Sequence, residues 1–154
     1  MFALARGFTL IEILVVVAIA LVVMGMALPI VQSSTSNYQL RSAVSTVAGA
    51  IQSTRYRAIS QGYPFQVVLS HSAGTYQLTS SPSNNGVFTT VTGYSAVPFG
   101  NPSTTLGADA TLQFSGGGSV KAVAGTMTLV LTRSGRTGTI TVSNYGNITT
   151  VYGP

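Results

Sequence analysis

The residue types that usually perform catalysis are scarce in this chain. It contains one histidine, His71, and two acidic residues, Glu12 and Asp109. A serine triad would have to join His71 and Asp109 to a serine, yet no serine lies in a nucleophile-elbow pattern. A glycosidase needs two carboxylates facing one substrate, and a zinc site needs several His, Cys or acidic ligands. The sequence therefore predicts no enzyme, no metal site and no cofactor.

Glu12 has the most unusual surroundings of these residues, because it lies inside an apolar run from Phe8 to Val31. A carboxylate in a bilayer costs up to about 2.5–3.5 kcal/mol, and the run contains no basic residue. A helix over Phe8–Leu28 would be about 31 Å long, which matches a hydrocarbon core about 30 Å thick. Since the run is apolar on every face, it predicts a membrane anchor rather than a buried core helix. The partner of Glu12 must then come from another chain.

The short segment before the anchor, residues 1–7, carries Arg6. An ordinary secretory signal places its hydrophobic region before the cleavage point and loses it. A cut after Gly7 would instead keep the anchor. Arg6 at the membrane favours a cytoplasmic N-terminus and an exported C-terminus.

The helical pattern changes beyond the anchor but does not stop. Pro29, with Gly25 before it, predicts a kink or an unwound stretch, because proline removes a helical hydrogen bond. Residues 32–62 then predict an amphipathic continuation, which Gly62 and Pro64 are expected to end. Its apolar stripe recurs at three- and four-residue steps: Leu40, Val44, Val47, Ile51 and Ala58.

The remaining residues, 63–154, predict a β-rich globular domain of short β-branched segments bounded by turn residues. Residues 80–110, rich in Pro and Gly, are expected to be irregular with one strand near 87–91. The predicted fold class is α+β: a long N-terminal helix, transmembrane in its first half, packed on an antiparallel β-sheet or sandwich-like domain. The other predicted strands are 65–70, 75–79, 111–114, 126–132, 139–143 and 147–152.

The charge balance is unusual because acids are missing. Only 6% of residues are charged and the formal net charge is +5, whereas soluble domains average roughly 25% charged residues. The basic residues are scattered along the sequence, which favours a weakly basic, solvated surface. A nucleic-acid interface would need them gathered on one face. The absence of cysteine excludes disulfides and thiolate metal sites.

The sequence Gly7-Phe8-Thr9-Leu10-Ile11-Glu12 resembles the processing site of type IV prepilins and pseudopilins. Pro29 also falls where such helices carry a kink-forming proline. The helix end at residues 51–62 is similar to that of GspH/FimT-type minor pilins, and so is the strand residue pattern Val67-Val68-Leu69. The segments Leu112–Phe114 with Gly116–Gly118, Thr126–Leu131 and Ile140–Gly146 resemble the C-terminal half of that family.

This resemblance implies a structural subunit of a type IV pilus or a type II secretion pseudopilus. A prepilin peptidase would cleave between Gly7 and Phe8 and N-methylate Phe8. The Phe8 amine would then pair with Glu12 of a neighbouring pilin or pseudopilin subunit. The chain would lie in the bacterial inner membrane with its C-terminal domain exported, and afterwards in a periplasmic or extracellular filament. Type IV pilus, secretion and competence machines all remain open, and so does major or minor status.

A second interpretation is a DNA-binding minor pilin for DNA uptake. Some FimT-like pilins bind DNA through basic residues in the last strand and tail. Where that pattern expects Arg after the glycine of the final hairpin, this chain has Gly146-Asn147-Ile148-Thr149. Arg133 and Arg136 on the preceding turn are the candidate DNA contacts, although two charges supply little salt-dependent affinity.

Overall fold

The computed structural model describes residues 8–100 and 103–153, except for the side chains of residues 26–33. The predicted leader (residues 1–7, with Gly7) and the side chain of Pro29 lie outside the described residues. The chain divides into two compact units, Met1–Thr35 and Ser36–Pro154.

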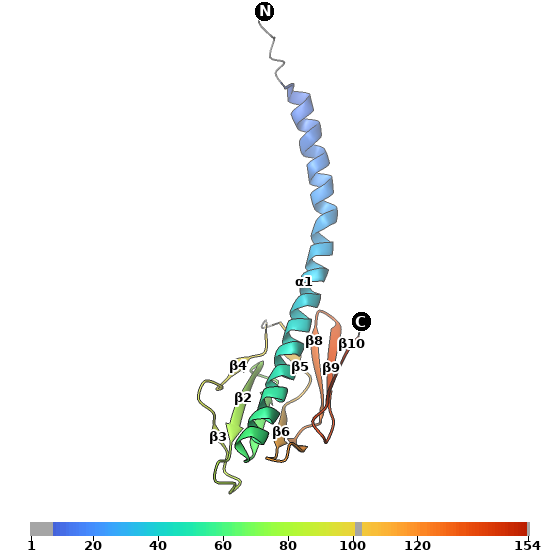
Figure 1. Ribbon diagram of the computed structural model, residues 1–154. Coiled ribbons are helices and arrows are strands. Elements are labelled where there is room, and N and C mark those ends of the chain that lie inside the picture. Colours follow the sequence, from blue (N-terminus) through green and yellow to red (C-terminus); the bar gives the residue numbers. More distant parts are fainter. Residues whose placement is uncertain (1–7, 101–102, 154) are drawn as a thin grey trace, which may run out of the picture. The chain divides into compact units, whose positions relative to one another are not determined.

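A single helix, α1, runs from Leu10 to Gln61 (Figure 1). It begins just after Thr9, whose hydroxyl accepts a hydrogen bond from the backbone N–H of Glu12 at 3.3 Å, as an N-cap residue does. It ends at Gly62, which has a φ of 73° and donates its N–H to the Ala58 carbonyl at 2.9 Å. Glycine adopts this left-handed conformation without steric cost, so it stops the helix at the predicted place.

The β-strands pair only in antiparallel fashion and form two sheets. In the first sheet the strand order is β3-β2-β1-β6-β7, and β4 also pairs with β2. Its strands are β1 (Phe65–Ser70), β2 (Thr75–Ser80), β3 (Thr89–Thr90), β4 (Val97–Pro98), β6 (Ala110–Phe114) and β7 (Val120–Ala124).

The second sheet has the strand order β10-β9-β8-β5. Its outer strand β10 continues a hairpin with β9, and short β5 joins the other side of β8. Its strands are β5 (Thr105–Leu106), β8 (Thr128–Arg133), β9 (Arg136–Val142) and β10 (Ile148–Gly153).

The predicted α+β class with antiparallel sheets is confirmed. The sequence analysis missed β7, whose lysine and alanines have low strand propensity and which pairs with β6 through a register shift at Thr111/Leu112. It also missed β4 and β5, because two-residue strands leave no period-two pattern to detect.

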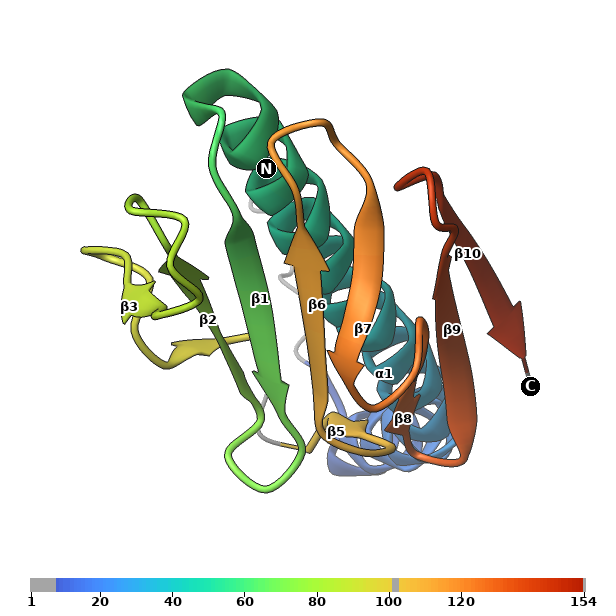
Figure 2. The same ribbon diagram turned by 90° about the horizontal axis from the view of Figure 1, so that it is seen from below.

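The core of the second unit lies between α1 and the two sheets. Figure 2 shows α1 along one face of both, so the helix supplies the layer that a second sheet would supply in a face-to-face sandwich. Strand β1 alternates buried and half-buried residues, as a strand packed on one face does. The buried residues of α1 repeat at helical spacing: Leu40, Ala43, Val44, Val47, Ala50, Ile51, Thr54 and Ala58.

Candidate assembly and binding sites

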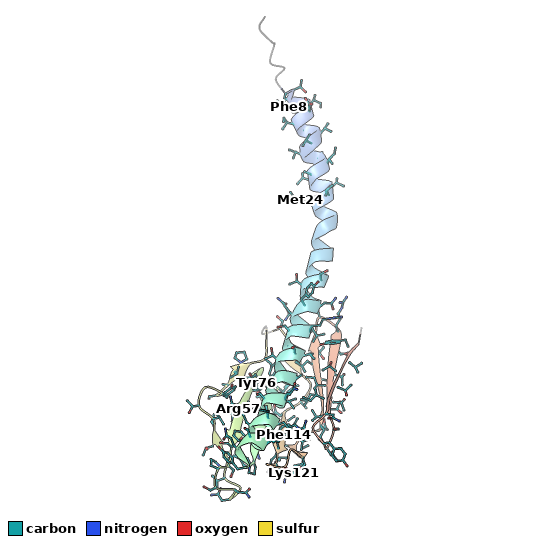
Figure 3. All side chains as sticks on the ribbon, in the orientation of Figure 1. Phe8, Met24, Arg57, Tyr76, Phe114 and Lys121 are labelled. Carbon is teal, nitrogen blue, oxygen red and sulfur yellow. The ribbon has the colours of Figure 1, made fainter. Side chains whose placement is uncertain are left out.

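Between Leu10 and Met24, α1 presents apolar side chains to solvent on every side. Leu10 is 83% exposed and Phe8 is 74% exposed. Figure 3 shows side chains projecting around the helix between the labelled Phe8 and Met24. An isolated helix that is apolar all round needs other apolar surface, from lipid or from protein, to cover it.

Glu12 lies exposed on this apolar segment, in the first turn of α1. Acidic residues are favourable in a first helical turn because they face the positive end of the helix dipole. The nearest basic residue that follows it in the sequence is Arg41, which belongs to the other compact unit. The carboxylate is therefore available to a cation from outside its own segment.

The backbone of α1 is helical through Gly25 and Pro29. Proline has no N–H to give to the carbonyl one turn earlier, which here belongs to Gly25. The kink or unwinding at these residues stays a prediction. Among the described residues, no helical stretch has both the length and the apolar content that a membrane span requires.

Arg55 joins the end of α1 to both sheets. Its Nε donates to the carbonyl of Gly118 at 3.3 Å, in the β6–β7 turn, and its Nη1 donates to the carbonyl of Gly146 at 3.5 Å, in the β9–β10 turn. A Cβ added at Gly146 would lie 2.5 Å from Arg55 Nε. Arg55 thus connects the helix end, which resembles that of GspH/FimT-type pilins, to two hairpin turns. Gly146 has no side chain and leaves room for Arg55.

Arg57, two residues further along α1, holds the irregular segment after β2. Its guanidinium lies 4.8 Å from the ring centroid of Tyr94, and Nη2 donates to the Tyr94 hydroxyl at 2.9 Å. Burial raises the pKa of the neighbouring Tyr76 hydroxyl, and Tyr94 adds to this shift. Figure 3 labels Arg57 on α1 and Tyr76 on β2. Because Arg57 and Tyr94 belong to the same compact unit, we interpret their contacts as stabilising its fold.

Arg133 and Arg136, the candidate DNA contacts, are paired residues at the β8–β9 turn. Arg133 donates from Nη1 to the hydroxyl of Thr104 at 3.3 Å, and its Nε is buried without a hydrogen-bond partner in the described structure. Arg136 instead lines a pocket together with residues of α1 and β10. The two guanidinium groups therefore have different surroundings.

The pocket at Arg136 was missed by sequence reasoning. It has a volume of about 360 Å³ and is lined by Asn37, Leu40 and Arg41 of α1, Arg136 of β9, and Tyr152 and Gly153 of β10. The Arg41 guanidinium carbon lies 5.0 Å from the centre of the Tyr152 ring. No local motif joins these residues. The pairing of β9 with β10 brings Arg136 near Tyr152 and Gly153, and α1 supplies Asn37, Leu40 and Arg41 from the other side of the pocket. The only sequence signal was the excess of basic over acidic residues.

His71 and Asp109 do come close, but not in a catalytic arrangement. The Asp109 carboxylate accepts a hydrogen bond from the backbone N–H of His71 at 2.6 Å, and Nδ1 of the imidazole contacts the Leu106 carbonyl oxygen. The carboxylate thus contacts the His71 backbone. The two contacts hold the turn after β1 to the segment that includes Leu106 and Asp109. Within the described residues, no group of three His, Cys, Asp or Glu side chains could hold a metal ion.

Comparison with known families gives two matches. Residues 43–146 match the family of the type II transport protein GspH. Residues 3–28 match the prokaryotic N-terminal methylation motif. No curated protein matches the chain, and no solved structure does.

An apolar N-terminal helix with a methylation motif, followed by an antiparallel β domain, defines a protein of the pilin and pseudopilin class. The GspH match covers more than half of the chain, so the chain belongs to the GspH family. The resemblance to GspH/FimT-type pilins predicted from the sequence is thereby confirmed.

Proposed function

We propose that this chain is a structural subunit of a type IV pilus or a type II secretion pseudopilus. The observation that carries the proposal is the exposed apolar half of α1, combined with the methylation motif that matches residues 3–28. A surface this apolar is stable only in a membrane or against other helices. Both environments fit a subunit that waits in the inner membrane and then enters a filament.

Assembly follows from the chemistry of the first residues. Prepilin peptidase cleaves between Gly7 and Phe8 and N-methylates the new α-amino group. This amine is a cation beside an apolar helix, and Glu12 of an adjacent subunit is its counter-ion. Pairing removes the cost of leaving either charge alone in an apolar filament core.

DNA uptake is the weaker function. Arg133 is held by Thr104, which makes its guanidinium less available to phosphates. The β9–β10 turn and strand β10, residues 143–153, contain no basic residue. Phosphate contacts supply most of the non-specific affinity for DNA, so this end of the domain is poorly equipped for it.

Intact mass of the chain in purified filaments tests the proposal. We expect the chain to copurify with filaments, to begin at Phe8 and to carry one N-methyl group. Gly7→Val should leave the uncut precursor in the membrane, because the peptidase site has no space for a side chain there. Ala3→Val, in the same leader, is the control and should be cut normally. A filament subunit that retains residues 1–7 would contradict the processing step, and absence from filaments would contradict the function.

A further inference from the structure

The basic residues of this chain have too few acids to neutralise them. It has seven Lys and Arg residues but only two acidic residues. One acid, Glu12, lies in the apolar half of α1, and the other, Asp109, accepts a hydrogen bond from His71. Most arginines therefore need either solvent or another chain to supply a counter-charge.

Two of these arginines line one pocket. Arg41 is exposed on α1 and Arg136 is half-buried on β9, and both border the cavity of about 360 Å³ together with Asn37 and Tyr152. The Tyr152 ring, 5.0 Å from the Arg41 guanidinium carbon, limits the freedom of that side chain by a cation–π contact. A guanidinium held in this way loses less entropy when it binds a ligand.

The pocket is suited to a carboxylate. A planar guanidinium binds a carboxylate through two parallel N–H donors, and here two arginines, Arg41 and Arg136, line one pocket together with the polar residues Asn37 and Tyr152. Nucleic acid fits less well, because its affinity depends on many phosphate contacts, whereas this pocket supplies two charges.

We infer that the pocket formed by Asn37, Arg41, Arg136 and Tyr152 binds an Asp or Glu side chain of a different, more acidic pilin subunit. This inference rests on the proposed function, since it requires a filament neighbour. A second copy of this chain offers only two acidic side chains. We assign Glu12 to the Phe8 amine, and Asp109 accepts a hydrogen bond from His71, so a subunit of another kind is the better partner.

Zero-length cross-linking in filaments tests this inference. Lys121 is the only lysine of the chain, so Arg41→Lys and Arg136→Lys each place one new amine in the pocket and keep its charge. A carbodiimide joins an amine to a carboxylate that contacts it directly. We expect both variants to form a cross-link to an Asp or Glu of another subunit type, well above the yield at Lys121. A cross-link within one chain, or yields equal to that of Lys121, would overturn the inference.

Charge removal gives an independent measurement. Arg41→Gln and Arg136→Gln should each lower incorporation into filaments by up to about fivefold, as expected for an ion pair partly open to solvent. Lys121→Gln removes the same charge from the first sheet and should change incorporation little. An equal loss in all three variants would overturn the inference, because it would report only net charge.

A gel shift of the full chain in detergent with a short DNA duplex tests whether the pocket binds nucleic acid instead of a carboxylate. We expect no difference between Arg41→Gln, Arg136→Gln and Lys121→Gln. A loss of DNA binding confined to Arg41→Gln and Arg136→Gln would assign the pocket to nucleic acid and overturn the inference that it binds a carboxylate. If the chain is found in filaments but its pocket forms no cross-link, the proposed function stands and only the pocket assignment fails.

Discussion

At the residue scale, a carboxylate in an apolar helix is costly unless a cation compensates it, and we therefore propose that Glu12 directs assembly. Glu12 is exposed in the first turn of α1, and the segment around it carries no base. We propose that the N-methylated Phe8 of a neighbour supplies the charge. Such a pair favours one axial register, because any other register buries both charges unpaired.

The variant Glu12→Gln separates charge from size. We expect normal membrane insertion and cleavage, because a neutral amide costs less in a bilayer than a carboxylate. Incorporation into filaments should fall at least roughly tenfold, since the neighbouring amine then lacks a counter-ion. Quantitative mass spectrometry of membranes and filaments measures both.

Two further variants make the Glu12 experiment specific to charge. Glu12→Asp keeps the carboxylate on a shorter side chain and should recover part of the incorporation, whereas Ile13→Val should behave as the unchanged chain. Full incorporation of Glu12→Gln at internal filament positions would rule out the charge pair, although the chain would remain a pilin.

Arg55 has a stabilising role, which its hydrogen bonds to two turns explain. Arg55→Met keeps most of the aliphatic stem and removes both bonds. We expect the free energy of unfolding to fall by about 1.5–2 kcal/mol, the lower part of the range for hydrogen bonds from a charged group, because both bonds are long and Arg55 is half-open to solvent. Urea unfolding in detergent, followed through the β-sheet circular dichroism of the second unit, measures this change in the free energy of unfolding.

The matched control for Arg55 is Lys121→Met, which makes a similar substitution at an exposed position. It should leave the unfolding midpoint nearly unchanged. Amide exchange should become faster at residues 115–119 and 143–147 in Arg55→Met alone. Equal stability of the two variants would show that the guanidinium contacts contribute nothing measurable.

At the scale of elements, α1 is expected to contain one weak turn. Its backbone is helical from Leu10 to Gln61, yet Pro29 cannot donate to the Gly25 carbonyl, and Gly25 itself lowers helix stability. Val22 and Val23 add β-branched side chains next to it, which favour a helix less than leucine or alanine. The helix is therefore expected to open locally between Leu21 and Ile30 more readily than at the other turns of α1 in the first unit.

The variant Pro29→Ala tests this weak turn. It restores an N–H donor and removes a cost of about 3 kcal/mol, so amide exchange between Leu21 and Ile30 should slow down by at least roughly tenfold. Leu28→Ala, next to it, keeps the proline and should leave the exchange fast. A free subunit in which this stretch already exchanges as slowly as residues 12–20 would contradict the expected kink or unwinding.

Sequence patterns predicted the elements that carry a local period. The stripe of Leu40, Val44, Val47 and Ile51 repeats at helical spacing, and each of these residues is buried. Strand β1 was predicted at its observed bounds from its short β-branched sequence, and its burial alternates as expected. β7 escaped detection because its burial pattern does not alternate cleanly and its pairing with β6 shifts register at Thr111/Leu112.

At the scale of the whole molecule, the candidate sites differ in how far sequence could predict them. Gly7, Phe8 and Glu12 lie in one contiguous motif, so their roles in processing and assembly could be predicted without a structure, and these roles stay predictions. The pocket unites Asn37 and Arg41 of α1 with Arg136 and Tyr152, residues that are distant in the chain and meet through the pairing of β9 with β10 and through the contact of Arg41 with Tyr152. Long-range register of this kind has no local sequence signal.

The division into two compact units, Met1–Thr35 and Ser36–Pro154, predicts that the second unit folds without the first. Leu40 is the first buried core residue of α1, so a fragment over residues 36–154 keeps the whole described core. We expect it to be monomeric and to unfold cooperatively with a stability of about 5–10 kcal/mol, while failing to enter filaments. Val47→Asp places an unpaired charge in that core and should abolish the transition seen by circular dichroism. An unfolded fragment would show that the second unit needs the apolar half of α1 in order to fold. A fragment that joins filaments as well as the full chain would show that the apolar half is not needed for assembly.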